Sequence, residues 1–124
     1  MNALLILAHG SRKKESNEEV LRLAEELDRT VGTGFDKVLC AFNQFSSPSA
    51  EQQIKAFSEL GARHITVLPY FIAAGSHVLS DIPQLVDEAK KIYPDIVFQI
   101  SPHFGAFKGV KNLIVHELSE IMTP

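Results

Sequence analysis

The amino-acid sequence predicts an α/β domain of three layers, in which a four-stranded parallel sheet lies between helices. Four short apolar runs rich in branched side chains alternate with four longer segments of helical periodicity. This β-α-β-α order joins parallel strands by helical crossovers, which cover both faces of the sheet. With 124 residues, of which 45% are hydrophobic, we expect one domain over residues 1–124 with a substantial core.

The expected strands cover residues 3–8, 37–42, 64–68 and 96–100. Each is a nearly continuous apolar run and not an alternation of apolar and polar residues. Continuous runs are typical of parallel strands that are buried on both faces.

The expected helices cover residues 15–31, 47–61, 80–94 and 105–122. The second should begin at Ser47 as the cap, carry Pro48 in its first turn and end at Gly61. The first is amphipathic, with acids on one face and these apolar residues on the other: Val20, Leu21, Ala24, Leu27 and Val31.

Composition and charge exclude several classes of protein. A formal net charge of −3 argues against a general nucleic-acid binder, which would carry a basic excess. No apolar run approaches the roughly 18 residues that a membrane span needs. The single cysteine, Cys40, cannot form an intramolecular disulfide, and the first residues do not resemble a signal peptide, so we expect a cytoplasmic location. Because Cys40 falls inside an expected strand, we predict a buried, inert thiol.

Three histidines follow expected strands. Ligands of open parallel sheets bind beyond the carboxyl ends of the strands, where His9, His77 and His103 could converge. His9 is interpreted as a metal ligand or general base, the alternative being a hydrogen-bonded residue that caps the first helix. His77 lies in a connection long enough to be functional. His103, between Pro102 and Phe104, is either a loop residue packed on aromatic rings or a ligand.

The remaining histidines and the basic segment admit plainer interpretations. His64 opens a strand at the opposite edge and His116 belongs to the last helix, so both are expected to be ordinary polar residues. The segment "SRKK" at 11–14 is either a solvated helix start or, with Ser11 as the cap and free N–H groups behind it, an anion site. A G-x-G-x-x-G loop, a Walker lysine loop and a G-x-S-x-G elbow are all missing from the sequence.

Four motifs carry a resemblance to a known family. They are "LLILAHGSR" at the start, "AFNQFSSPS" at 41–49, "VLPYFIAAGSHVLSDIP" at 67–83 and "YPDIVFQISPHFG" near the end. In these motifs the chain resembles the class II tetrapyrrole chelatases, specifically the short CbiX-type sirohydrochlorin cobaltochelatases and their ferrochelatase and nickelochelatase relatives. The resemblance implies the chelatase-like, flavodoxin-like fold.

The resemblance also implies an activity and a site. The activity is insertion of Co²⁺, Fe²⁺ or Ni²⁺ into sirohydrochlorin or a closely related tetrapyrrole, without nucleotide hydrolysis and with no cofactor beyond the metal substrate. His9 and His77 would hold the metal and accept the pyrrole protons. The tetrapyrrole would be bound by Ser11, Arg12, Lys13, Phe45 and Ser76. Four aromatic residues are either apolar walls for the macrocycle or core residues: Phe42, Phe45, Tyr70 and Phe71.

One position departs from the family pattern. Gln44 stands where these enzymes usually have a glutamate, so a neutral amide replaces a carboxylate that could ligate the ion. Gln44 and His103 are therefore additional candidate metal ligands, with His103 as a substitute for the missing carboxylate. Two functions stay open: a metallochelatase, or a metal or tetrapyrrole carrier that kept the fold. Long chelatases carry two such units, so we expect a homodimer here.

Overall fold

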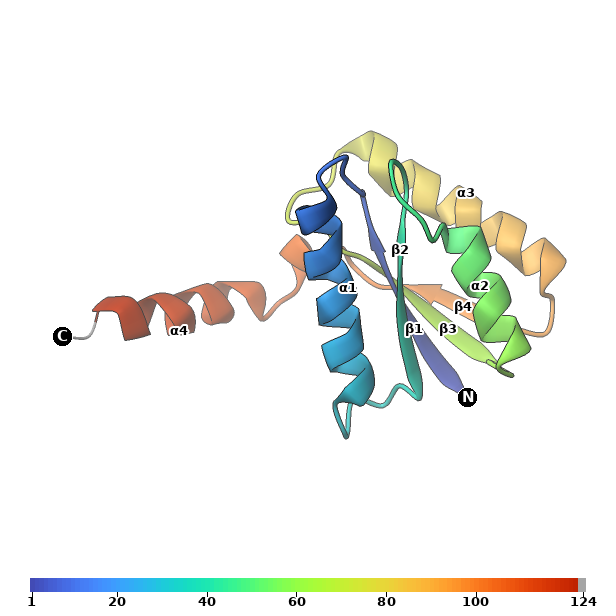
Figure 1. Ribbon diagram of the computed structural model, residues 1–124, viewed down its shortest axis with the longest axis horizontal. Coiled ribbons are helices and arrows are strands. Elements are labelled where there is room, and N and C mark those ends of the chain that lie inside the picture. Colours follow the sequence, from blue (N-terminus) through green and yellow to red (C-terminus); the bar gives the residue numbers. More distant parts are fainter. Residues whose placement is uncertain (123–124) are drawn as a thin grey trace.

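The centre of the computed structural model is a sheet of four parallel strands in the order β2-β1-β3-β4 (Figure 1). The structure describes the backbone of residues 1–122 and the side chains of residues 1–75 and 80–122. The strands are β1 (Asn2–Ala8), β2 (Lys37–Phe42), β3 (His64–Pro69) and β4 (Val97–Ile100). The predicted fold class and strands are confirmed, with strand ends displaced by one residue at most.

Helices cover the sheet on both faces. Helix α1 (Lys14–Arg29) lies on one face, and α2 (Ala50–Glu59) and α3 (Ser76–Ile92) lie on the other (Figure 1). A short 3₁₀ helix, η1 (Phe104–Ala106), follows β4 and leads into α4 (Val110–Met122), which extends away from the sheet. Within the described residues, none of these helices combines the length and apolar character that a bilayer crossing requires.

Two apolar clusters hold these layers together. Alternate side chains of the strands point to opposite faces, so Leu5 and Leu7 of β1 pack under α2 and α3 while Leu4 and Ile6 pack under α1. On the larger cluster Phe57 of α2 is fully buried. The central strand β1 is thereby buried on both faces, which fixes the position of the residues that follow it.

Four sequence expectations about helix boundaries are wrong. Ser49, not Ser47, caps α2: its hydroxyl accepts a hydrogen bond from the N–H of Gln52, whose side chain accepts one from the N–H of Ser49. Pro48 therefore precedes the cap and does not lie in the first turn. Helix α3 begins at Ser76, earlier than expected, and the last expected helix is divided into η1 and α4.

Two expectations about burial are also wrong. Val31 lies beyond the end of α1 and is 96% exposed, so it does not extend the buried face of that helix. Strand β4 is buried at Phe98 only, and its residues Val97, Gln99 and Ile100 are exposed. Val97 and Gln99 of β4 lie with His64 and Thr66 of β3 along a depression on the side of the sheet where α1 covers β1 and β2 (Figure 1).

Candidate functional site

His9 follows the last residue of β1, the strand that lies between β2 and β3 in the sheet. Its side chain is exposed, and its ring lies against the ring of Phe71, with centroids 4.1 Å apart and planes tilted by 36°. Phe71 itself is buried in the core. A rigid aromatic surface therefore supports an imidazole that solvent and ligands can reach, which is the setting that a metal ligand or general base requires.

Gly10 draws the loop after β2 against the loop after β1. Its φ is +85°, and a β-carbon there would overlap the carbonyl oxygen of Gln44. The Gln44 N–H donates to the His9 carbonyl oxygen at 3.0 Å, and the Asn43 N–H donates to the Ala8 carbonyl oxygen at 3.0 Å. The expected neighbourhood of His9 and Gln44 is thus present in the backbone, and the Gln44 side chain is exposed. Sequence reasoning overlooked Gly10, although a glycine two residues after the end of a buried strand is a usable signal.

Ser11 does not cap the first helix, so this expectation is wrong. Helix α1 begins at Lys14 with Lys13 at its cap position, and no side chain caps it. Asn17, which is buried, holds Ser11 instead: its Oδ1 accepts from the Ser11 N–H at 2.9 Å and its Nδ2 donates to the Ser11 carbonyl at 2.8 Å. The Ser11 hydroxyl accepts from the Lys13 N–H at 3.0 Å. The N–H groups of Ser11 and Lys13 thus have acceptors in the side chains of Asn17 and Ser11, which removes them from the anion site expected there.

Arg12 and Phe45 form the polar and aromatic part of this edge. The guanidinium carbon of Arg12 lies 4.8 Å from the centroid of the Phe45 ring, and that ring is 57% exposed. Phe45 has a φ of +63°, a conformation that side chains seldom adopt. Lys13 is exposed next to this pair. The loops after β1 and β2, which are bonded to each other at His9 and Gln44, thus carry cationic side chains and an accessible flat ring.

The four aromatic candidates are separated by their burial. Phe42 is a core residue, and Phe71 is buried beneath His9, so neither offers a free face to a ligand. Tyr70 is half-buried and its ring lies 5.4 Å from that of Phe104, which follows β4. Phe45 and Tyr70 therefore remain as the aromatic surfaces available at this edge.

The loop after β4 is fastened to the end of β3. The Gly105 N–H donates to the carbonyl oxygen of Phe71, the residue whose ring lies against His9, at 2.9 Å. His103 is half-buried at the start of η1, with no hydrogen bond from its side chain that would cap this helix. In the part of the chain with described side chains, no three His, Cys, Asp or Glu residues lie close enough to hold a metal ion together.

The side chains of Ser76 and His77 lie outside the described residues. The backbone shows that both belong to the first turn of α3, whose cap position is Gly75, and not to the loop in which His77 was expected. The expected convergence of His77 with His9 and His103 stays a prediction.

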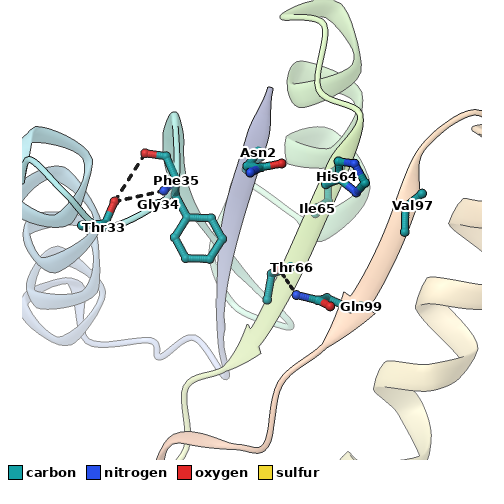
Figure 2. A pocket seen from close by; sticks show the side chains of 10 residues that line it. Asn2, Thr33, Gly34, Phe35, His64, Ile65, Thr66, Val97 and Gln99 are labelled. Carbon is teal, nitrogen blue, oxygen red and sulfur yellow. Dashed lines mark hydrogen bonds between the residues drawn. The ribbon is translucent and has the colours of Figure 1, made fainter.

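The other singled-out residues behave as expected. Cys40 is buried in β2, and desolvation raises the pKa of its thiol to about 11, so it is protonated and inert at neutral pH. His116 lies on α4 with its Nε2 3.8 Å from Oε1 of Glu120. His64 opens β3 and lines a depression of about 430 Å³ at the amino ends of the strands, the edge opposite to His9 (Figure 2).

An all-parallel sheet with an exposed histidine, cationic side chains and accessible rings beyond its carboxyl edge defines a ligand-binding α/β domain. The protein-family model described as CbiX matches residues 3–121. The chain belongs to the CbiX family.

The chain is similar in sequence to two named relatives and in structure to one solved protein. The sirohydrochlorin cobaltochelatase of Methanocaldococcus jannaschii is 39% identical over 87 residues, which cover 69% of this chain and 59% of the relative. The sirohydrochlorin cobaltochelatase of Sulfurisphaera tokodaii is 27% identical over 98% of this chain and 95% of the relative. The crystal structure of the sirohydrochlorin chelatase SirB from Bacillus subtilis subspecies spizizenii, in complex with cobalt, superposes with a TM-score of 0.79 and 27% identity over 97% of this chain and 50% of that one.

The chain spans about half the length of two other relatives that it matches. It covers 44% of the sirohydrochlorin ferrochelatase of Priestia megaterium and 54% of the chloroplastic enzyme of Arabidopsis thaliana.

Proposed function

We propose that this chain is a metallochelatase that inserts a divalent ion, Co²⁺, Fe²⁺ or Ni²⁺, into sirohydrochlorin or a closely related tetrapyrrole without nucleotide hydrolysis. The observation that carries the proposal is His9, an exposed imidazole supported on Phe71 at the carboxyl end of the central strand. Imidazole nitrogen suits all three ions. Membership in the CbiX family, whose named relatives include sirohydrochlorin chelatases, supports the choice of substrate.

The chemistry needs a ligand that also accepts protons. Insertion replaces two pyrrole N–H bonds with bonds from nitrogen to the metal and releases two protons for each ion inserted. A neutral imidazole at His9 can present the ion, release it to the macrocycle and then receive a proton. We propose that His77 is the second group of this kind, and that the metal is a substrate and no further cofactor takes part.

The tetrapyrrole is a flat ring system that carries several carboxylates. Arg12 and Lys13 offer it positive charge, and the exposed face of Phe45 offers an apolar surface next to the Arg12 guanidinium. We propose that these side chains bind the macrocycle and that Ser76 adds a contact from α3. Ser11 supports the loop through Asn17 and contributes no free N–H of its own.

The proposed assembly is a homodimer. The chain matches half of the SirB chain, so one copy supplies one of two α/β units. A second copy related by a two-fold axis would provide the other side of the cleft. A cytoplasmic location and a single unit over residues 1–124 stay part of this proposal.

A carrier of metal or tetrapyrrole is the second candidate, and Gln44 is the observation that favours it. The amide lies on the loop bonded to His9, where a carboxylate would bind the ion more strongly. A carrier would bind the same ligands through the same edge without converting them.

The visible spectrum of sirohydrochlorin mixed with Co²⁺ or Fe²⁺ separates the two functions. A chelatase accelerates insertion above the spontaneous rate, and His9→Ala removes the acceleration while His116→Ala, at an exposed position on α4, retains it. Spectral shifts on binding without acceleration favour the carrier. No binding and no acceleration would contradict both functions.

A further inference from the structure

Asn17 is buried although its side chain is polar. It lies in the first turn of α1, is 9% exposed, and is the one buried polar residue among those whose side chains the structure describes. Burial of an amide costs free energy unless its donor and its acceptor both find partners. The partners of Asn17 therefore indicate what this buried amide contributes.

Both partners belong to one residue of the loop after β1. Oδ1 of Asn17 accepts from the Ser11 N–H at 2.9 Å, and Nδ2 donates to the Ser11 carbonyl oxygen at 2.8 Å. Hydrogen bonds are directional, so two bonds to one residue fix its orientation as well as its position. The amide thus holds the backbone of Ser11 in a single arrangement.

The residues after Ser11 are bonded in sequence from this fixed point. The Lys13 N–H donates to the Ser11 hydroxyl at 3.0 Å, and the Ser16 N–H donates to the Lys13 carbonyl oxygen at 3.2 Å. Arg12 lies between Ser11 and Lys13, so bonded residues on both sides set the direction of its backbone. Its guanidinium carbon is the atom that lies 4.8 Å from the centroid of the Phe45 ring.

His9 is held by other contacts. Its carbonyl oxygen accepts from the Gln44 N–H at 3.0 Å, and its ring lies against that of Phe71. Neither contact involves Asn17. The loop after β1 is therefore fastened at two separate points, by Gln44 at His9 and by Asn17 next to Arg12.

We propose that Asn17 is a positioning residue for tetrapyrrole binding, which holds the loop so that the Arg12 guanidinium stays over Phe45 and meets a carboxylate of the macrocycle. A guanidinium pairs with a carboxylate through a rigid fork of donors, so its direction determines how well it pairs. A side chain that is oriented in advance also loses less conformational freedom when the ligand binds. Asn17 acts on affinity for the tetrapyrrole, and not on the insertion step at His9.

Because this role of Asn17 rests on the proposed tetrapyrrole site, its test measures affinity, which a chelatase and a carrier both have. Fluorescence titration with metal-free sirohydrochlorin gives the dissociation constant without any metal insertion. A wild-type chain that binds sirohydrochlorin but does not accelerate insertion would contradict the chelatase, and the affinities of the variants would still decide the role of Asn17. A wild-type chain with no affinity for sirohydrochlorin would overturn that role together with the site.

A double-mutant cycle between Asn17 and Arg12 is the decisive experiment. We expect Asn17→Ala to raise the dissociation constant about fivefold, the order of one net hydrogen bond. In an Arg12→Ala background the same substitution should add less than about twofold, because the side chain that Asn17 positions is already gone. An unchanged constant in Asn17→Ala, or equal factors in the two backgrounds, would overturn the proposal.

A second variant covers the case in which Asn17→Ala does not fold. Asn17→Leu removes both hydrogen bonds to Ser11 but keeps a side chain of similar size with a high helix propensity. Val20 and Ala24 follow at helical spacing and pack on the apolar cluster under α1, so a leucine at position 17 extends that face. We expect the same rise in the dissociation constant as for Asn17→Ala. A folded Asn17→Leu chain with the wild-type affinity would overturn the proposal.

Gln53→Ala is the matched control for a general loss of stability. Gln53 of α2 is half-buried, and its Nε2 donates to the Cys40 carbonyl oxygen at 2.8 Å, so the substitution removes a bond of the same kind on a different helix. Urea unfolding compares the stability of the variants. We expect Gln53→Ala to keep the wild-type affinity, and Asn17→Ala to raise the KM for sirohydrochlorin with kcat within about twofold of the wild type. An equal rise in the dissociation constant in Gln53→Ala, or a fall in kcat at constant KM in Asn17→Ala, would overturn the positioning role.

Discussion

Gly10 and Gln44 approach so closely that only a glycine fits: a β-carbon on the first would overlap the carbonyl oxygen of the second. This approach holds the loop after β2 against His9, together with the hydrogen bond from the Gln44 N–H to the His9 carbonyl oxygen. The position of the Gln44 backbone next to that of His9 therefore depends on a residue without a side chain.

Gly10→Ala should destabilise the protein far more than Gly32→Ala does. Both glycines have a φ near +85°, at +85° and +84°, but a β-carbon on Gly32 would meet open space. We expect about 1 kcal/mol for Gly32→Ala from the backbone conformation alone, and roughly 3 kcal/mol or more for Gly10→Ala. Urea unfolding of both variants measures the difference. Equal losses of unfolding free energy in the two variants would show that the loops after β1 and β2 can move apart without a cost in stability.

Phe71→Leu should slow metal insertion more than its effect on stability explains. The substitution keeps an apolar side chain in the core but removes the ring 4.1 Å from the His9 ring. Phe57→Leu is the matched control, because Phe57 is buried in the same cluster and belongs to α2. We expect similar losses of stability, about 1 to 2 kcal/mol, and a lower kcat only for Phe71→Leu. A similar kcat in the two variants would argue against a positioning role for Phe71.

The sheet and the edge at which His9 lies could be predicted because they follow from the local pattern of apolar residues. Contacts between distant residues could not. Ser11 does not cap α1, because Asn17, six residues later, bonds its backbone. The overlap at Gly10 involves a loop more than thirty residues later. Periodicity identified a helix near the carboxyl terminus, but it gave no information on whether that helix packs on its own sheet. Helix α4 does not pack on the sheet, and the residues of β4 other than Phe98 are exposed.

Replacing Arg12 with alanine should weaken tetrapyrrole binding in a salt-dependent way. The substitution removes a positive charge and the contact at 4.8 Å with the Phe45 ring. Arg22→Ala is the control, because Arg22 is exposed on α1 and its substitution removes the same charge at a distance from the proposed site. Fluorescence titration at low and high salt gives the affinities. An Arg12→Ala affinity equal to that of Arg22→Ala at both salt concentrations would withdraw Arg12 from substrate binding.

Asp28→Asn should lower the stability at neutral pH and lose its effect in acid. The Val38 N–H, 2.8 Å from Oδ1, and Lys37, whose Nζ is 3.2 Å from Oδ2, hold the pKa of Asp28 below its usual 3.8, although burial opposes them. A lowered pKa means that the charged carboxylate stabilises the folded state above pH 3.8 and that this contribution is lost as the pH falls below it. We expect a loss of about 1 kcal/mol at pH 7, modest because water screens the pair.

The control for this measurement is Asp95→Asn, at an exposed position. Thermal unfolding from pH 7 to pH 2.5 should show the wild type and Asp28→Asn converging below about pH 4, with Asp95→Asn close to the wild type throughout. A difference that persists unchanged at pH 2.5 would mean that the carboxylate charge is not what Asp28 contributes.

Gln44→Glu should accelerate metal insertion above neutral pH. The variant restores a carboxylate on the loop that is bonded to His9, which adds a hard oxygen ligand and an attraction to the divalent ion. The same charge favours the protonated form of a neighbouring imidazole, and a protonated imidazole cannot bind the ion. The two effects oppose each other, so we expect the gain in rate to shrink as the pH falls to about 6, within the usual range of histidine titration.

The position of His103 decides how this result is interpreted. His103 is half-buried at the start of η1 and is the candidate that would take over from the missing carboxylate. Initial rates over a pH series are therefore measured for Gln44→Glu in the wild-type and the His103→Ala backgrounds. Rescue confined to the His103→Ala background would assign the carboxylate's role to His103. No change at any pH in either background would mean that the side chain at position 44 points away from the metal, although its backbone is bonded to His9.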